Sequence, residues 1–482
     1  MMSEETTFFL PVKDYCHRGL ITCNLNDTVR ASAQAMRDKG ISSLIVCDEQ
    51  NQPVGIMTDR DLRSKVVAGG LNPDTVKVSE VMTAPVISVS EDDTLFEVLY
   101  QMSHHRIHRV GVVDAQNILV GIINESDIIR LQNRSPQRLL RAIDEAQVIA
   151  DLKKIHHESE QLIVFLSRSG VRTKELVRLI SLLNDQIVEK LIALLKHGRF
   201  KDMGQKSAFL VLGSEGRREQ TLKTDQDNAI IIADDASQDE LDDIEAFSNV
   251  LVDSLIEIGV PECPGGIMAK NEFWRRRLSD WQSAIDGWIA APSGRNILNF
   301  SMFSDMRTLC GNADLEQQLR AHIVLRAEEN TIFLARMAAN VCLFPPPIGM
   351  FGRIKTEKSG EHIGMIDLKK AGIFALTEGV KTLALKIGVL EGSTHDKLEA
   401  LMKKGILNQA QVDDIEASFN LLTFLRLRGQ VNSASAGREI TNYISPGSLD
   451  RVEKGRLKLA LDVVQSFQGM LNQAFQLDML RR

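Results

Sequence analysis

The sequence predicts an α+β protein of several domains, and three observations carry that prediction. An internal repeat fills the first 135 residues, two apolar strands flank a glycine turn and an Asp-x-Asp pattern at 207–233, and helical periodicity dominates from about residue 313 onward. A chain of 482 residues, 44% of them apolar, suits about three domains of roughly 150 residues each. We therefore expect four consecutive regions, at residues 1–135, 136–200, 201–310 and 311–482.

The composition excludes several classes of protein. The chain has no run of about eighteen apolar residues and no basic-then-apolar N-terminal segment, so neither a membrane span nor an export signal is expected. Six scattered cysteines without a CxxC pair fit a reducing cytoplasm better than disulfides or zinc. A net charge of −7 without a basic block argues against general nucleic-acid binding, including RNA tailing. We expect a cytoplasmic protein with no membrane or nucleic-acid partner.

The repeat is an internal duplication. Residues 21–61 and 87–127 align without a gap at an offset of 66 residues, and each copy is predicted to form strand, helix, strand, turn, strand and helix. The copies are expected at about 14–78 and 79–135. Identical pairs include Ile21/Ile87, Asp27/Asp93, Thr28/Thr94, Met36/Met102, Ile41/Ile107, Asp48/Asp114, Gly55/Gly121 and Asp61/Asp127.

This duplicated pattern resembles a tandem pair of cystathionine-β-synthase (CBS) domains, a family that usually binds adenine nucleotides between its two copies. The ligand signature of that family is met by Thr58 and Asp61 in GIMTDRD. A hydroxyl can donate to a phosphate, and a carboxylate can accept from both ribose hydroxyls. The second copy has Asn124 in place of Thr and keeps Asp127, which predicts one competent site more readily than two. Arg109 is a candidate phosphate contact or a surface residue.

The resemblance implies AMP, ADP or ATP as a regulatory ligand and a homodimer formed through the pair. A role in dimerisation alone is the alternative. Residues 136–200 follow as a predicted helical hairpin, which either transmits a change in the pair or packs as a bundle.

The chemical motif follows this hairpin and reads GSEGRREQTLKTDQDNAIII. Strands are predicted at 207–212 and 226–233. Gly213 and Ser214 end the first strand, where backbone N–H groups can approach a phosphate closely, and Arg217 and Arg218 can balance triphosphate charge or face solvent. Two residues apart on one strand, Asp225 and Asp227 share a face about 6.6 Å apart and can hold divalent cations. The motif predicts a triphosphate site.

Together these features resemble the polymerase β superfamily of nucleotidyltransferases, and most closely its PII-uridylyltransferase branch. The order of regions, with CPGGIMAKNEFW, FSDMRTLCG, PPPIGMFGR, IDLKKAG and LRLRGQ, is similar to bacterial signal-transduction nucleotidyltransferases across almost the full chain. That resemblance implies Mg²⁺ or Mn²⁺, a nucleoside triphosphate donor, and a C-terminal helical domain that binds the substrate.

The superfamily usually has a third carboxylate on a later strand, as general base or metal ligand. A helix is predicted at about 275–290 and a strand at 297–305, so Asp305 at the end of that strand is the candidate. The alternative is that Asp305 only caps the next segment. Further candidates for contact with the nucleotide or acceptor are Lys270, Asn271, Lys369 and Arg426.

The expected activity is transfer of a nucleoside monophosphate to a hydroxyl of a protein or small-molecule acceptor, regulated by adenine nucleotide at the repeat. The alternative from another class is a nucleotide sensor whose core does not turn over. The histidines at 104, 105 and 108 lack a completing carboxylate and are interpreted as surface residues, and His395-Asp396 as the start of a helix. Donor base and acceptor are not readable from the chain.

Overall fold

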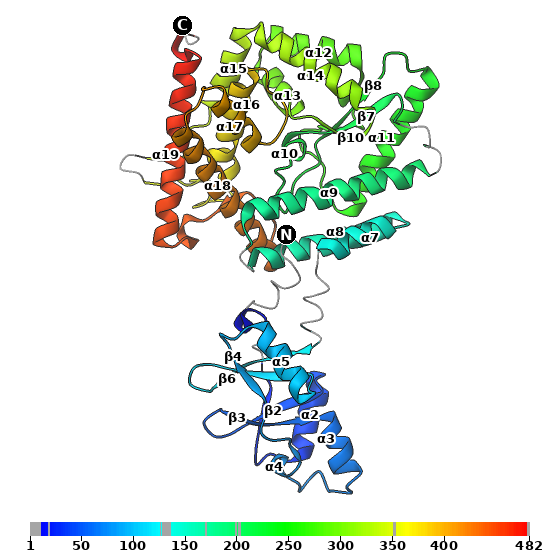
Figure 1. The fold of residues 1–482 in the computed structure, drawn as a ribbon, viewed down its shortest axis with the longest axis vertical. Helices are drawn as coiled ribbons and strands as arrows, with labels where there is room; N and C mark the ends of the chain where they lie inside the picture. Colours follow the sequence, from blue (N-terminus) through cyan, green and yellow to red (C-terminus); the bar gives the residue numbers. More distant parts are fainter. Residues whose placement is uncertain are drawn as a thin grey trace. The chain divides into compact units, whose positions relative to one another are not determined.

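The computed structural model describes residues 11–17, 20–125, 127, 136–168, 171–197, 200, 204–349 and 353–479. It divides into two compact units, residues 1–135 and 136–482 (Figure 1). Within the described ranges, no helix is long and apolar enough to cross a membrane. The repeat therefore forms one unit, and the chemical motif and the helical region share the other.

The first unit contains two copies of one small sheet. Each sheet has three strands, in the orders β1-β2-β3 and β4-β5-β6, with the first two strands parallel and the last two antiparallel. This confirms the predicted strand, helix, strand, turn, strand order. Most of the helix expected after the second copy lies outside the described residues. The elements are η1 (Val12–Asp14), β1 (Thr22–Asn24), α2 (Val29–Lys39), β2 (Ser43–Cys47), β3 (Pro53–Thr58), α3 (Asp59–Asp61), η2 (Leu62–Val67), α4 (Val78–Val81), β4 (Ser88–Ser90), α5 (Leu95–His105), β5 (Arg109–Val113) and β6 (Leu119–Asn124).

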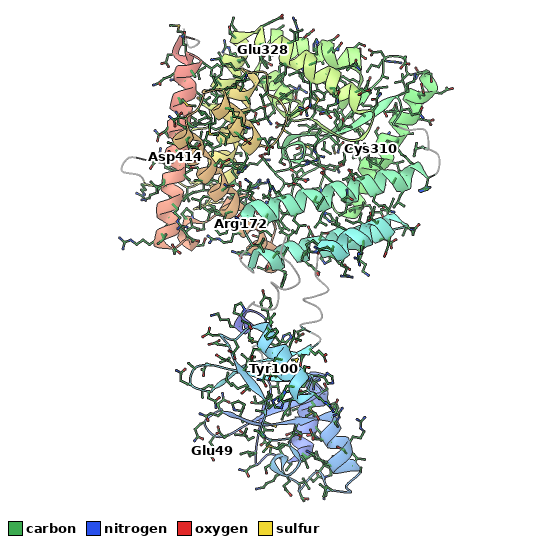
Figure 2. The ribbon with its side chains drawn as sticks, in the orientation of Figure 1. Glu49, Tyr100, Arg172, Cys310, Glu328 and Asp414 are labelled. Carbon is green, nitrogen blue, oxygen red and sulfur yellow. The ribbon has the colours of Figure 1, made fainter. Side chains whose placement is uncertain are left out.

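The two copies share an apolar contact. Ile45 and Cys47 on β2 cluster with Leu119 on β6, so each sheet buries side chains against the other copy. The outer face of α5 is different, because Tyr100 is 52% exposed there and stacks on His104 (Figure 2). The duplicated sequence thus folds as one body with a common core.

Three helices open the second unit. α7 (Pro136–Glu145), α8 (Ile149–Arg168) and α9 (Thr173–Lys196) are where a helical hairpin was predicted. Leucine and isoleucine recur on one face of α8 and α9, and those faces pack on each other and on the sheet that follows. The predicted break at 169–170 lies outside the described residues. The hairpin is therefore part of the core that holds the chemical motif.

The central sheet has four strands in the order β10-β7-β8-β9. Alternate residues of β7 and β8 face opposite sides: Leu210 and Ile231 pack under one helical layer, while Phe209 and Ile230 pack under the other. Helices cover both faces, so these two strands are apolar throughout. The elements are β7 (Ser207–Val211), α10 (Gly213–Gly216), β8 (Asn228–Ile232), α11 (Gln238–Ile258), η3 (Glu272–Trp274), β9 (Arg275–Arg277), α12 (Leu278–Ala290), α13 (Gly294–Phe303) and β10 (Arg307–Gly311).

The strand predicted at 297–305 is wrong, because most of that segment is helix α13. The Ser293 hydroxyl accepts from the Asn296 backbone N–H at 3.2 Å and caps the helix. Ile297, Phe300 and Phe303 then fall on one helical face, and Phe303 stacks on Trp281 with centroids 4.1 Å apart. The strand comes later, as β10. It is an edge strand of mostly half-buried residues, which lacks the apolar run that marks a central strand.

The remaining chain is helical, as predicted, with one addition. A two-stranded antiparallel sheet pairs β11 with β12, across a long sequence separation. The helices pack around their own apolar cluster, which includes Leu376, Leu422 and Leu461. The elements are α14 (Ala313–Glu328), α15 (Thr331–Val341), β11 (Ile366–Asp367), η5 (Lys369–Ile373), α16 (Phe374–Leu385), α17 (Thr394–Lys403), α18 (Gln409–Ser435), β12 (Tyr443–Ile444), η6 (Pro446–Ser448), α19 (Arg451–Ala474) and η7 (Leu477–Met479).

Candidate active site

The glycine turn after β7 lies directly against one of the two carboxylates. Gly213 has φ +54°, and a Cβ added to it would lie 2.9 Å from Met302 Cε and 3.3 Å from Asp227 Oδ2. The backbone conformation favours glycine, and a side chain here would also have to displace the end of Met302 and crowd Asp227. The helix that starts here, α10, is a single turn. Only a backbone without a side chain reaches this close to Asp227.

Asp225 and Asp227 sit just before β8, in extended chain, and not on the strand itself. The backbone fixes them from two sides: the Leu212 N–H donates to the Asp227 carbonyl at 2.9 Å, and the Gln226 N–H donates to the Pro261 carbonyl at 3.0 Å. Both side chains are half-buried. The two carboxylates are thus held by hydrogen bonds of their own main chain.

Burial raises the pKa of Asp227 to about 6, and the charge of neighbouring Asp225 adds to the increase. A hydrogen bond from the Cys263 thiol and the cations Lys369 and Arg217 act in the opposite direction. Two carboxylates this close repel each other when both are ionised. A cation placed between them would relieve that repulsion.

Two cations of the C-terminal helices face this carboxylate pair. Lys369 on η5 interacts with both Asp225 and Asp227, and Arg426 on α18 interacts with Asp225. Burial lowers the pKa of Arg426 to about 10, against the attraction of Asp367 and Asp225. Lys369 and Arg426 are two of the residues the sequence picked as nucleotide or acceptor contacts. The helical region therefore contributes positive charge that acts on the carboxylates of the core.

Arg217 and Asp305 belong to a sealed cluster beside this site. Arg217 donates to Glu219 at 2.8 Å and also to Asp305, which receives Lys381 at 2.7 Å and Lys397 at 3.8 Å. Asp305 and both lysines are at most 4% exposed. Burial alone would raise the pKa of Asp305, but Arg217, Lys381 and Lys397 together hold it below its usual range. A carboxylate this strongly neutralised is a poor proton acceptor.

The structure therefore places Asp305 differently from the strand end predicted for it. It lies in the turn between α13 and β10, and its partners are arginine and lysine side chains. Arg217, which the sequence proposed for the triphosphate, has a side chain only 11% exposed and is committed to the same cluster. The cluster joins the core to α16 and α17, because Lys381 and Lys397 lie on those helices. Its geometry fits a structural joint better than an open catalytic surface.

The other sequence candidates are spread around the site. Arg218 has φ +55° and a 64% exposed side chain, with its Nε 3.8 Å from Asp185 Oδ2. The side chain of Ser214, next to Gly213, is half-buried. Lys270 pairs with Glu262 at 2.8 Å, and Asn271 caps η3 by accepting from the Phe273 N–H at 3.0 Å. The last two residues therefore have local structural roles.

The residues present fit a magnesium–triphosphate site of the minimal kind. In the ranges that the structure describes, no three His, Cys, Asp or Glu side chains group closely enough to form a protein-only metal site. Mg²⁺ commonly needs only one or two carboxylates, and water and substrate phosphates complete its shell. Asp225 and Asp227, which repel each other, supply those two, and burial raises the pKa of Asp227 to about 6. The donor set fits a cation that arrives with its nucleotide.

Several functional side chains escaped the sequence reading. Cys263, in the CPGG turn, hydrogen-bonds Asp227, and buried Glu215 has its pKa raised to about 8 by burial and by Asp185, against Arg307. Lys381 is fully buried in the apolar helix LTEGVKTLALK. A lysine on the apolar face of a helix needs a buried partner, so the sequence did contain a signal for it. Cys263 carried no such signal, because its partner is distant in sequence.

In the repeat, each signature aspartate accepts a hydrogen bond from the backbone N–H of the last residue of the preceding strand. The Thr58 backbone N–H donates to Asp61 at 3.0 Å, and the Asn124 N–H donates to Asp127 at 3.0 Å. The Asp61 carboxylate also receives Lys65 at 2.8 Å, and Arg109 donates across the copies to Ser42 at 2.5 Å.

Among the described residues, Asp127 has fewer hydrogen-bond and ion-pair partners than Asp61, and its second partner is the exposed His17 at 3.2 Å. The Asp61 carboxylate accepts from Thr58 Oγ1 at 2.7 Å and from Thr83 Oγ1 at 3.1 Å as well. The two copies therefore have the same local geometry but different access to the carboxylate.

Comparison with known proteins agrees with this division of the chain. Family models match as "Putative nucleotidyltransferase DUF294" at residues 157–295, "Putative nucleotidyltransferase substrate binding domain" at 331–475, and "CBS domain" at 12–68 and 78–134. The second unit thus carries a nucleotidyltransferase-type region and its substrate-binding domain.

Individual relatives cover about a quarter of the chain. Hypoxic response protein 1 of Mycobacterium tuberculosis is 33% identical over 118 residues, which are 24% of this chain and 82% of that protein. Uncharacterized protein MK0525 of Methanopyrus kandleri is 37% identical over 121 residues, 25% of this chain and 62% of that protein. A solved structure, the CBS domain pair of protein MJ0100 with 5-methylthioadenosine and S-adenosyl-L-methionine, is 31% identical and covers 26% of this chain and 95% of its own, with TM-score 0.24.

The chain belongs to the CBS-domain proteins, and within them to those that carry a DUF294 nucleotidyltransferase region followed by its substrate-binding domain.

Proposed function

We propose that this protein transfers a nucleoside monophosphate from a nucleoside triphosphate to a hydroxyl group of an acceptor. The observation that carries the proposal is the half-buried pair Asp225 and Asp227, set against the Gly213 turn on one side and against Lys369 and Arg426 on the other. Carboxylates for a cation, a side-chain-free turn for phosphate oxygens and two positive side chains are the parts such a transfer needs.

The residues have distinct roles in this proposal. Gly213 and Ser214 form the turn for the triphosphate, Asp225 and Asp227 hold Mg²⁺ or Mn²⁺, and Lys369 and Arg426 balance phosphate charge. A divalent cation bound there would neutralise the triphosphate and the developing charge. The acceptor oxygen forms a bond to the α-phosphorus, the bond from that phosphorus to the bridging oxygen breaks, pyrophosphate leaves, and the hydroxyl proton passes to solvent.

The proposal also assigns a ligand to the repeat. An adenine nucleotide would bind the CBS pair, with Thr58, Asp61, Asn124, Asp127 and Arg109 as the candidate contacts, and would tune transfer. Titration of the full chain with AMP in a calorimeter tests this, with Asp127→Ala and Asp61→Ala as variants. Heat that is unchanged in both variants would show that these carboxylates do not hold the ribose.

The experiment for the transfer itself uses four α-labelled nucleoside triphosphates with cell extract and Mg²⁺. Incorporation that requires Asp225 and Asp227 supports the proposal and identifies the donor base. No incorporation from any of the four, with the protein folded, contradicts it.

A second candidate is a nucleotide-responsive signalling protein that does not turn over. It is favoured by the commitment of Asp305 to Arg217, Lys381 and Lys397, since no described carboxylate completes a group of three with Asp225 and Asp227. Tight nucleotide binding without incorporation would distinguish this candidate from the transferase.

A further inference from the structure

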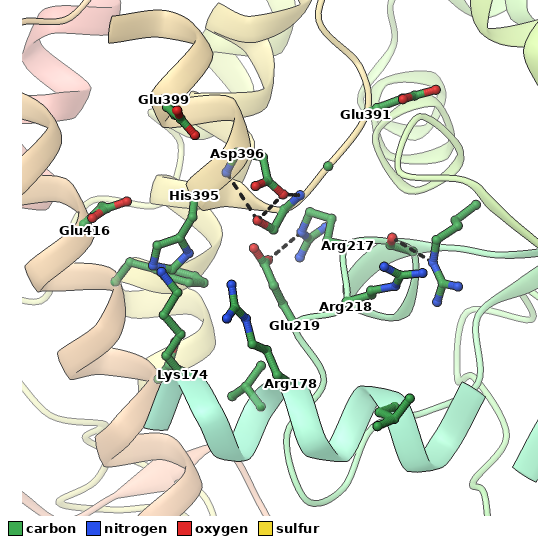
Figure 3. A pocket seen from close by; sticks show the side chains of 18 of the residues that line it. Lys174, Arg178, Arg217, Arg218, Glu219, Glu391, His395, Asp396, Glu399 and Glu416 are labelled. Carbon is green, nitrogen blue, oxygen red and sulfur yellow. Dashed lines mark hydrogen bonds and ion pairs between the residues drawn. The ribbon is translucent and has the colours of Figure 1, made fainter. Parts of the chain in front are cut away.

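The second unit contains a large cavity that the proposed transfer site does not use. Its volume is about 1140 Å³, and its walls come from α9, the turn after α10, β10, α17 and α18 (Figure 3). None of Gly213, Ser214, Asp225 and Asp227 lines it. The volume exceeds the roughly 300–1000 Å³ of a pocket for one drug-sized molecule.

The cavity adjoins the turn of the transfer site, because Gly216, Arg217 and Arg218 line it and follow Gly213 and Ser214 closely in the chain. One face of α18 forms a further wall, with Val412, Glu416, Phe419 and Thr423 at helical spacing. A chain bound in this cavity would therefore lie beside the glycine turn.

One wall of the cavity carries unneutralised positive charge. Lys174 and Arg178 stand one turn apart on α9 and point toward His395 and Glu219 (Figure 3). Among the described residues, neither Lys174 nor Arg178 forms an ion pair with a carboxylate. Arg218 adds a third cation with a 64% exposed side chain.

The facing wall carries carboxylates. Glu399 on α17 and Glu416 on α18 line it, together with Asp413. His395 lies between the basic and the acidic wall, with its ring edge-on to Phe419 and the two centroids 5.5 Å apart. Its Nε2 is shielded from solvent and has no hydrogen-bond partner among the described residues. The cavity thus offers both positive and negative side chains to an occupant.

We propose that this cavity is the acceptor site, and that the acceptor is a polypeptide segment carrying both acidic and basic side chains next to the modified hydroxyl. The inference rests on the proposed transfer function and specifies its acceptor. Acidic side chains of the segment pair with Lys174, Arg178 and Arg218, and basic ones pair with Glu399 and Glu416. Opposed charged walls select such a segment and fix its direction.

The test follows label from α-labelled nucleoside triphosphate into extract, and separates acid-precipitable protein from acid-soluble product. The charge-reversal variants are Lys174→Glu with Arg178→Glu, and Glu399→Lys with Glu416→Lys. The matched control is Lys153→Glu with Lys154→Glu on the exposed face of α8. Tryptophan fluorescence and the stabilisation by Mg²⁺–nucleotide verify that each variant folds and still binds donor.

With wild type and control, label enters protein. With either cavity variant, the initial rate at limiting extract falls about tenfold or more, while stabilisation by Mg²⁺–nucleotide is unchanged. Label found only in acid-soluble product, or protein labelling that the cavity variants do not slow, overturns the inference and leaves the transfer function standing. No label from any triphosphate overturns the transfer function, and the inference with it.

Discussion

Two aspartate centres interact with Arg217, and they differ in burial, in charge balance and in the direction of their pKa shifts. Asp225 and Asp227 are half-buried and repel each other, and among the described residues they form no ion pair with the neighbouring cations Lys369 and Arg426. Asp305 is sealed and already bound to Arg217, Lys381 and Lys397. Burial raises the pKa of Asp227 to about 6, whereas three cations hold the pKa of Asp305 below its usual range.

Residue type and motif therefore do not determine the role of a carboxylate in this protein. A carboxylate whose charge is unbalanced inside the protein is ready to bind a cation, whereas one balanced by internal lysines is ready only to hold elements together. The Asp225 and Asp227 pair of the core is of the first kind. The second kind joins the core to α16 and α17.

The largest expected effect is on transfer. Replacing Asp225 and Asp227 together with Asn removes the cation-binding charge, so we expect the rate of nucleotide incorporation to fall about 10³-fold or more. Unfolding of the second unit can be followed by fluorescence, because all three tryptophans lie in it. The double variant should be at least as stable as wild type, since the substitutions remove the repulsion between the two carboxylates. Asp253→Asn on α11, with a side chain 69% exposed, is the control. Full activity in the double variant would remove the distinction between the two centres.

The next effect is on stability, at the other centre. Asp305→Ala leaves Lys397 buried without its ion-pair partner and leaves Lys381 with Glu378 alone, at 2.9 Å. We therefore expect the free energy of unfolding of the second unit to fall by about 3–5 kcal/mol. The measurement is urea unfolding monitored by tryptophan fluorescence, and Asp413→Ala is the exposed control.

Asp305→Asn tests the same difference between the two aspartate centres, because asparagine keeps the shape of the side chain and removes its charge. We expect reduced stability with transfer retained in the fraction that is folded. Stability equal to wild type together with lost transfer would instead restore Asp305 as a general base or metal ligand.

A smaller effect is expected at the turn between the centres. Gly213→Ala forces a side chain into φ +54° and against Met302, so we expect a loss of about 1–2 kcal/mol and weaker nucleotide binding. Met302→Ala in the same chain should relieve the contact but not the backbone strain. Gly287→Ala, which meets nothing within 4 Å in α12, is the control and should be neutral or slightly stabilising. A neutral Gly213→Ala would contradict the close approach of turn and carboxylate.

The smallest effect is a difference in pH dependence without metal. The pKa of Asp227 is raised when the protein folds, so its contribution to stability is complete below about pH 4 and lost as pH rises through about 6. Wild type should therefore lose stability relative to Asp227→Asn over that interval. The pKa of Asp305 is lowered, so the advantage of wild type over Asp305→Asn should instead shrink as pH falls below about 4.

Unfolding midpoints at a series of pH values in a chelating buffer measure both differences. If the stability differences of the two variants from wild type change with pH in the same direction, the two carboxylates share one environment. If they change in opposite directions, burial dominates at Asp227 and ion pairing dominates at Asp305.

The sequence predicted the parts of the fold that depend on local pattern. Short continuous apolar runs located β7 and β8, the repeat located the two small sheets, and the Gly213 turn was correctly placed between strands. It failed at 297–305, where a short apolar run fits both strand and helix periodicity and the packing of Phe303 on Trp281 decides for helix.

The sequence alone predicts the identity and order of the chemical groups: a side-chain-free turn, then two carboxylates two residues apart, following a duplicated CBS-type module. Which groups lie close to each other is set by the tertiary structure. Lys369, Arg426, Lys381 and Lys397 come from helices that follow the motif by more than 130 residues, and Cys263 comes from a loop. The physical reason is that a carboxylate takes its properties from burial and from charges within a few ångströms, and those neighbours are brought together only by folding.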